Sequence, residues 1–151
     1  MRISLIVVIL LTSFHPSAPD ANAQGMDKKA AIVIYRIKGM TAKLLDPSVY
    51  CDAREVAYAT NGRYFTLFVD AGKHAIESND EKTVVTIDAK AGETYFVNVA
   101  MGKSTARSRW GVWGAVSQVS KEVAMPLILK LKPLDAKRVL EKAAISIDPI
   151  R

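Results

Sequence analysis

The sequence predicts a mainly β protein, a single antiparallel β-sandwich of about seven to nine short strands with one C-terminal helix. Short segments rich in β-branched and aromatic residues recur along the chain, and turn-forming residues separate them at short intervals. Only one segment, near the end of the chain, has the apolar spacing of an amphipathic helix. Together these observations favour two packed layers of antiparallel strands with a helix docked on them.

The first residues predict a secretory signal peptide. Arg2 precedes an apolar run from Ile3 to Leu11, and Ala21-Asn22-Ala23 fits the small-x-small cleavage pattern. The run is shorter than the about 20 apolar residues of a transmembrane helix, and no later segment is long enough to span. The sole cysteine lies far from the cleavage point, so we do not expect a lipoprotein. We expect an exported protein, periplasmic or secreted, with an uncleaved anchor as the alternative.

Domain boundaries follow from this assignment. Residues 1–23 form the signal peptide, 24–29 a flexible segment, 30–146 the β-sandwich domain with its C-terminal helix, and 147–151 a tail. The length that remains after cleavage suits one domain. Cys51 has no partner for an internal disulfide, and alternation places it on the same strand face as Val49. We therefore expect Cys51 to be a buried and unreactive side chain.

Several segments have the composition of strands. They are residues 30–37, 48–53, 54–60, 63–70, 74–78, 83–89 and 94–100. Asn61-Gly62 lies between two of them and predicts a type I′ hairpin, a turn that needs positive φ at both central positions. Residues 127–132 alternate, which predicts a further strand with Leu127, Leu129 and Leu131 inward and Ile128 outward.

The predicted helix lies in the sequence PLDAKRVLEKAA, residues 133–144. Asp135 is a good N-cap, and an apolar stripe follows at helical spacing, formed by Ala136, Val139, Leu140, Ala143 and Ala144. We expect this helix to dock on the sheet or at an open end of it; a position on a membrane surface is the alternative.

Ala-Gly followed by a charged residue occurs twice, at Ala71-Gly72 and Ala91-Gly92. A phosphate-binding loop needs several closely placed glycines and a following helix, whereas here each glycine precedes a strand. Gly72 and Gly92 are therefore predicted to be turn residues that supply backbone freedom, and no phosphate loop is expected.

The order IVIYR, EVAYATNGRYFTLFVDAGKHAI and IDAKAGETYFVNVA resembles the bacterial family of domain of unknown function 2846, which is similar to PEGA-type surface domains. The resemblance covers roughly residues 30–140 and implies an exported β-sandwich. Ala71 departs from it, since the family usually has proline there. The resemblance implies no activity, because none is established for the family. The matching positions are Tyr35, Arg36, Asn61, Gly62, Tyr64, Phe65, Gly72, His74, Gly92 and Tyr95.

No catalytic constellation is recognisable, so we expect a protein that is not an enzyme, with no cofactor and no metal site. After cleavage His74 is the only histidine, and it is predicted to pack or hydrogen-bond at the start of a strand. One histidine, one cysteine and scattered carboxylates show no metal-ligand spacing. Arg36, at the end of an apolar strand, is expected to pair with a carboxylate.

The basic surplus is confined to the last third of the chain. Residues 24–100 contain 10 Lys/Arg and 10 Asp/Glu, whereas residues 101–151 contain 10 and 4. In an exported chain this excess favours anionic lipid, polysaccharide or an envelope protein as partner, with no nucleic acid, although a basic surface is also common for solubility.

Both tryptophans lie in residues 103–118, which are read as a glycine-rich connection between strands. The predicted binding residues are Trp110 and Trp113, with Arg107 and Arg109 to steer the partner, because tryptophan and arginine are enriched at binding hot spots. The alternative is that the indole rings cover the open end of the sandwich. The predicted function is a non-catalytic binding or cell-envelope-associated module; a small-ligand or lipid carrier and an unrecognised hydrolase are the alternatives.

Overall fold

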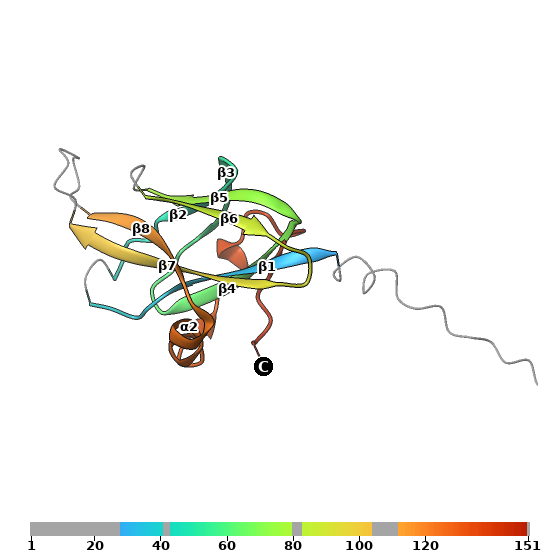
Figure 1. Cartoon of the computed structure of the whole chain (residues 1–151). Helices are drawn as coiled ribbons and strands as arrows, with labels where there is room; N and C mark the ends of the chain where they lie inside the picture. The colour runs from blue at the N-terminus through green and yellow to red at the C-terminus, as the bar shows by residue number, and fades with distance from the viewer. Residues whose placement is uncertain (1–27, 41–42, 80–82, 104–111, 151) are drawn as a thin grey trace, which may run out of the picture.

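The fold consists of two β-sheets packed face to face, with a helix on the outer face of the larger sheet (Figure 1). The structure is a computed structural model that describes residues 28–40, 43–79, 83–103 and 112–150. Within these ranges it contains ten strands, two of them only two residues long, and one α-helix. The predicted mainly β fold with two sheets and one helix is confirmed.

The larger sheet is mixed, with both antiparallel and parallel strand pairs. Its order is β10 (Ile145–Ser146), β4 (Arg63–Asp70), β1 (Lys29–Arg36), β7 (Thr94–Lys103) and β8 (Val112–Val119). A short strand, β9 (Lys132–Pro133), also pairs with β4. The β1–β7 and β4–β9 pairs are parallel, so the sandwich is not antiparallel throughout.

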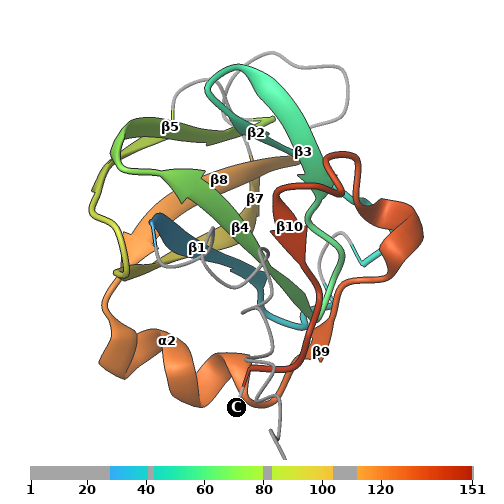
Figure 2. The same cartoon turned by 90° about the vertical axis from the view of Figure 1, so that its right-hand side faces the viewer.

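The smaller sheet covers the inner face of the larger one (Figure 2). Its order is β3 (Arg54–Tyr58), β2 (Ser48–Cys51), β5 (Gly72–Ser78) and β6 (Val84–Ala89), and all its ladders are antiparallel. β5 and β6, which follow each other in the chain, pair antiparallel from Gly72 and Ala89 to Glu77 and Val84. These strands agree with the segments that the sequence predicts.

Strand β1 is buried on both faces, as its almost continuous apolar run indicates. Ile32 and Ile34 point into the core between the sheets, where Val49, Phe65 and Ile76 also lie. On the other face, side chains of β1, β4 and β7 form a second core with the helix; its members are Val33, Tyr35, Tyr64, Phe96, Ala124 and Ile128. The two cores give β1 apolar contacts above and below.

Residues 127–132, predicted as a strand, contain the last two residues of the helix α2 (Lys121–Ile128), a turn and the first residue of β9, so that strand prediction is wrong. The predicted burial is reversed at two positions, because Ile128 is 1% exposed and Leu129 is 65% exposed, whereas Leu127 and Leu131 are partly buried. Ala124 and Ile128, four residues apart, form the buried stripe that packs on the sheet. Pro126 inside the helix weakens the helical signal in the sequence.

The helix predicted over residues 135–144 is also wrong. Asp135 does cap a turn, since its side chain accepts a hydrogen bond from the N–H of Lys137, but only a 3-10 turn, η1 (Ala136–Arg138), follows. Val139 is extended and forms an isolated bridge with Ala57 of β3. The helical preference of this alanine-rich segment is weak, and Val139 pairs with the edge of β3 instead of continuing a helix.

The turns differ in part from those predicted. Gly62 has φ +73°, but β3 and β4 belong to different sheets, so Asn61-Gly62 is not a type I′ hairpin. Gly72, with φ +142°, is the first residue of β5, and Gly92, with φ +79°, lies in the turn before β7; the chain passes from one sheet to the other at both positions. The predicted turn role is confirmed for Gly92, and the predicted backbone freedom for both glycines.

A two-residue hairpin joins β2 and β3 at Asp52 and Ala53, which have φ 52° and 63°. Positive φ at both central positions is the type I′ pattern. The sequence does not predict this turn, because neither residue is glycine.

Candidate functional site

Two regions at opposite ends of the sandwich contain the candidate functional residues. β1 and β4 are antiparallel, with Arg36 opposite Arg63 and Lys29 opposite Asp70. The end at Arg36 holds the described residues that connect β1 to β2, and because β7 runs parallel to β1 and antiparallel to β8 it also holds the end of β7 and the start of β8 (Figure 1). We call this end the loop end and the opposite one, at Asp70, the turn end.

The loop end presents an apolar loop, which we define by the described residues of 37–45. Met40 is 88% exposed and Leu44 92%, and Ile37 and Leu45 are partly exposed as well. The charged side chains of this loop are Lys38 and Lys43, and it contains no acidic residue. Large apolar side chains that are this exposed and lie beside cations are typical of a surface that contacts a partner or a lipid headgroup layer.

A hollow of about 270 Å³ lies beside the apolar loop, between the ends of β1 and β7. Gly39, Met40, Asn98 and Met101 contribute to its lining. The side-chain oxygen of Asn98 is buried and has no hydrogen-bond partner among the described residues. Arg36, Lys38 and Asn61 also line the hollow, so its walls are both apolar and polar.

The base of the apolar loop is held by buried and hydrogen-bonded residues. Arg36 is buried, and its guanidinium donates hydrogen bonds to the main-chain carbonyls of Leu45 and Ala59. Burial lowers the pKa of Arg36, and the charge of Asp46 opposes this effect. The side chain of Asn61 both donates to and accepts from the main chain of Gly39. The loop is thus anchored at its base while Met40 and Leu44 project outward.

The predicted binding residues fall at or beyond the edge of the described structure. Trp110, Arg107 and Arg109 lie outside the described residues. Trp113 belongs to β8, where its main chain is opposite Gly102, so the predicted connection of residues 103–118 is shorter than expected and ends in a strand. The end of β7 and the start of β8 lie at the loop end, where Met101 lines the same hollow as Met40. The exposed apolar loop itself was missed, although its mixture of leucine, methionine and lysine was available as a signal.

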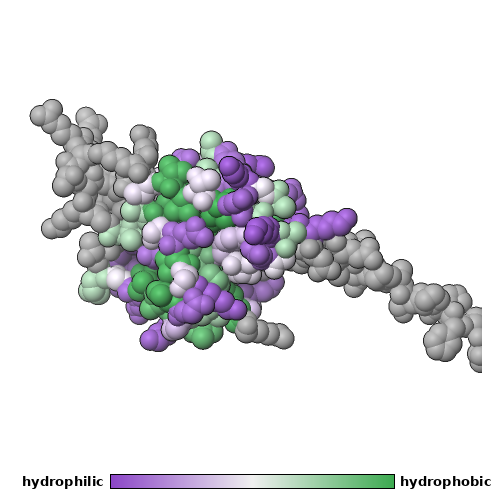
Figure 3. Space-filling view, in the orientation of Figure 1, coloured by the Kyte–Doolittle hydropathy of each residue, from purple (hydrophilic) through white to green (hydrophobic). Residues whose placement is uncertain are grey.

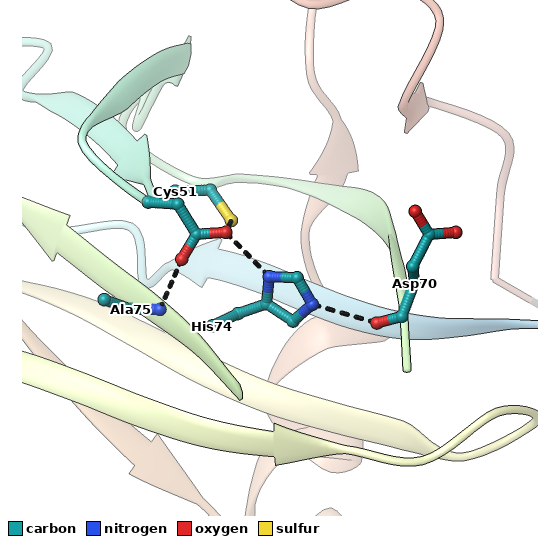
Figure 4. Close-up of polar contacts among 5 residues, drawn as sticks. Cys51, Asp70, His74 and Ala75 are labelled. Atoms are coloured by element: carbon teal, nitrogen blue, oxygen red, sulfur yellow. Dashed lines mark hydrogen bonds and ion pairs between the residues drawn. The ribbon is translucent and has the colours of Figure 1, made fainter. Parts of the chain in front are cut away.

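At the turn end, side chains of Cys51, Asp52 and His74 converge (Figure 4). The Cys51 thiol donates to Asp52 Oδ2 at 3.7 Å, and His74 Nδ1 lies 2.7 Å from the same oxygen. The second carboxylate oxygen accepts the N–H of Ala75 at 2.9 Å, and His74 Nε2 lies 2.9 Å from the carbonyl of Asp70. The predicted hydrogen bond from His74 to the preceding turn is confirmed.

The electrostatics of this group argue against a reactive cysteine. Burial, together with the charge and hydrogen bond of Asp52, raises the pKa of the Cys51 thiol to about 12. Burial lowers the pKa of His74, but hydrogen bonds to Asp52 and Asp70 and their charges outweigh it, so the pKa of His74 is raised. Cys51 is buried in the core with Val49, as predicted. A nucleophilic cysteine needs a lowered thiol pKa, and this geometry provides the opposite.

A third feature is an apolar groove of about 290 Å³ on the outer face of the larger sheet, beside α2. Val33, Phe68, Phe96, Met125 and Ile150 contribute its apolar lining. Figure 3 shows hydrophobic residues over the helix at the bottom of the view and over strands at the top, with hydrophilic residues between them. Within the described ranges, no helix has the length and apolar character needed to cross a membrane.

Comparison with known protein families gave one match. The model of the family described as protein of unknown function (DUF2846) matches residues 26–112, more than half of the chain. The chain belongs to the DUF2846 family. Comparison with curated proteins and with solved structures gave no match.

Several positions that carry the DUF2846 resemblance have structural roles in this chain. The Tyr95 hydroxyl accepts the N–H of Lys90 and lies within hydrogen-bond distance of Glu93 Oε2 and the carbonyl of Asp88, which closes the turn between β6 and β7. The hydroxyl of Tyr64 accepts the N–H of Ile150 and so fixes the C-terminal segment. Family membership assigns no function, so the candidate sites rest on this chain's own residues.

Proposed function

We propose that this DUF2846 protein is an exported, non-catalytic binding module of the cell envelope, and that its loop end docks on an anionic lipid surface. The observation that carries the proposal is the exposure of Met40 and Leu44 on a loop whose charges are all positive. Apolar side chains inserted at the headgroup boundary and lysines near anionic lipids both contribute to membrane-surface affinity.

Two further features support this proposal. β7 ends in Lys103 at the loop end, and the residues that follow it in the sequence, 104–111, include Arg107, Arg109 and Trp110 and no acidic residue. Tryptophan is enriched at membrane interfaces, and arginine and lysine attract anionic headgroups. The apolar run and Ala21-Asn22-Ala23 at the start of the chain support export.

The first experiment tests the lipid surface. The chain that begins at Gln24 is sedimented with vesicles of phosphatidylcholine alone and of phosphatidylcholine with phosphatidylglycerol. We expect binding to the anionic vesicles, weakened by salt, and lost in the double variant Met40→Ser/Leu44→Ser. Val123→Ser is the control, because Val123 is an exposed apolar residue of α2 on the outer face of the larger sheet and does not belong to the apolar loop.

The outcomes separate the partner from the module. If the protein binds isolated envelopes but not vesicles, and Met40→Ser/Leu44→Ser removes that binding, the partner is an envelope protein or a polysaccharide and not lipid. No retention on either would refute the binding module. Export is tested separately by intact mass: a mature protein outside the cytoplasm that begins at Gln24 supports it, and retention of Met1 on a cytoplasmic protein contradicts it.

The groove beside α2 favours a second candidate function, a carrier of a small apolar ligand. The gap between the sheets beside Ile34, Phe65 and Leu134 has no room for a water molecule and therefore none for such a ligand. The groove, by contrast, has room for part of an acyl chain. Binding of a fluorescent fatty acid by the protein, and loss of that binding in the variant Met125→Glu, would support this function. Equal binding by the variant would contradict it.

A further inference from the structure

The residues at the turn end bring three different metal-ligating atoms together. Cys51 is the last residue of β2, Asp52 begins the hairpin to β3, and His74 lies near the start of β5. β2 and β5 are paired with Cys51 opposite Ile76, so Cys51 and His74 lie close together at the rim of the sandwich. The Cys51 Sγ atom, a carboxylate oxygen of Asp52 and a ring nitrogen of His74 all lie within 4.8 Å of one another.

The hydrogen bonds around these atoms orient them. The carbonyl of Asp70 only accepts, so His74 Nε2 must carry a proton to donate to it. His74 Nδ1 then faces Asp52 Oδ2, which is also an acceptor, at 2.7 Å. A positive species belongs between these two atoms, and a proton and a metal ion both satisfy that requirement. A histidine whose second ring nitrogen donates to a carbonyl is the usual arrangement of a metal ligand.

We infer that Cys51, Asp52 and His74 form a binding site for a divalent transition-metal ion of the zinc type. The ligand atoms are Sγ, Oδ2 and Nδ1, with water or an external ligand in the fourth position. Metal binding displaces the thiol proton of Cys51 and any proton on His74 Nδ1, and both are released to solvent. A thiolate, an imidazole and a carboxylate together suit Zn²⁺ or Co²⁺ and not Mg²⁺ or Ca²⁺.

Two of the three distances between ligand atoms can be compared with those of a tetrahedral site. Zinc–ligand bonds of about 2.0–2.3 Å place neighbouring ligand atoms about 3.3–3.5 Å apart. The separation of Sγ and Oδ2 is 3.7 Å, and that of Nδ1 and Oδ2 is 2.7 Å, so the imidazole and the carboxylate have to separate by about half an ångström. The Asp52 side chain is 51% exposed, which leaves the fourth position accessible from solvent.

The surrounding main chain supports the site without being part of it. Ala75 N–H holds Asp52 Oδ1, which leaves Oδ2 for the metal. The positive φ of both Asp52 and Ala53 creates the hairpin that turns this carboxylate back toward β5. The sequence shows no ligand spacing because Asp52 and His74 are 22 positions apart and meet only through the pairing of β2 with β5.

The test is a Co²⁺ titration of the purified full chain after treatment with a chelator. Cys51 is the only cysteine, so a thiolate-to-cobalt charge-transfer band in the near ultraviolet reports this residue alone. We expect that band together with tetrahedral d–d bands in the visible, and their loss when Zn²⁺ is added in competition. Cys51→Ala removes the charge-transfer band, and Asp52→Asn and His74→Gln lower the Co²⁺ affinity by about 10–100-fold or more.

Asp70→Asn is the matched control, because Asp70 contributes its main-chain carbonyl, which this substitution retains. It removes a nearby negative charge but no ligand atom, so it is expected to lower the Co²⁺ affinity far less than Asp52→Asn or His74→Gln. Visible bands without charge transfer, or charge transfer with unchanged affinity in Asp52→Asn and His74→Gln, would overturn the inference. Circular dichroism is used to check that each variant is folded. If Cys51→Ala does not fold, the Co²⁺ affinities of Asp52→Asn and His74→Gln decide the test.

Discussion

Ala53 occupies a backbone conformation that alanine normally avoids. Its φ of 63° lies in the left-handed region, where the Cβ atom of an L-residue approaches the following carbonyl oxygen. The neighbouring Asp52 shares this region, but its side chain gains hydrogen bonds from Ala75 and with His74. Ala53 is exposed and has no such side-chain compensation, so the hairpin between β2 and β3 contains strain at this one residue.

Ala53→Gly is therefore expected to stabilise the protein by about 0.5–1 kcal/mol, since relief of the left-handed strain exceeds the added entropy of the unfolded chain. The measurement is the free energy of unfolding from urea denaturation. Ala71→Gly is the control, because Ala71 is exposed and has no positive φ, and it is expected to be neutral or destabilising. Equal effects of the two substitutions would contradict the strain argument.

Cys51 is expected to be unreactive in the folded protein. Its side chain is buried with Val49, and burial raises the pKa of its thiol, so little thiolate is available to a reagent. In the presence of a chelator, labelling by a thiol reagent should be slow in buffer and rapid in denaturant. Cys51→Ser should cost about 1–3 kcal/mol of stability because it buries a poorly bonded hydroxyl. Rapid native labelling or a disulfide-linked dimer would show that the thiol is accessible.

At the scale of elements, the sequence predicts the strands of the two sheets well and the C-terminal third poorly. Strands β4 and β7 are rich in β-branched and aromatic residues and lie between turn residues. Their local composition is therefore enough to predict them. Residues 127–132 and 135–144 have weak patterns, and tertiary contacts decide their conformation. Residues 121–128 become helical by packing Ala124 and Ile128 on the larger sheet, and Val139 is extended because it joins β3.

Two single substitutions distinguish the observed helix from the strand that the sequence predicts. Ile128→Ala is expected to destabilise the protein by about 2–4 kcal/mol, because it leaves a cavity between α2 and the sheet. Leu129→Ala is expected to change stability by less than about 0.5 kcal/mol, since Leu129 is exposed. The alternating strand pattern predicts the reverse order, so thermal or urea denaturation of the two variants decides between them.

Gly114 in β8 is needed for close packing between the sheets. A Cβ atom at this position would lie 2.6 Å from Ser78 Oγ and 2.9 Å from Pro47 Cβ. Gly114→Ala is thus expected to cost about 1–3 kcal/mol by forcing β8 away from the smaller sheet. Gly39→Ala is the control, because nothing lies within 4 Å of its added Cβ and its φ is not positive. Equal stabilities of the two variants would show that β8 adjusts without cost.

At the scale of the whole molecule, the sandwich separates two kinds of surface. The loop end presents Met40 and Leu44 with lysines, and the turn end brings Cys51, Asp52 and His74 together. The composition of the sequence indicates the first, because apolar and basic residues are adjacent in the chain. It does not indicate the second, because the register of β2 with β5 determines that contact and single-sequence patterns do not specify register between strands of different hairpins.

The loop end also gives the predicted role of Trp110 and Trp113 a specific test. If the indole rings bind a partner, replacing both by alanine should abolish vesicle binding with little change in melting temperature, since exposed rings contribute little to the core. Replacing Arg107 and Arg109 by alanine should weaken binding in a salt-dependent way. If the rings instead cover the sandwich, the tryptophan double variant should melt at a much lower temperature, because truncating a buried ring costs about 3–5 kcal/mol. A large loss of stability would therefore exclude the tryptophans from the binding surface and leave it to the apolar loop.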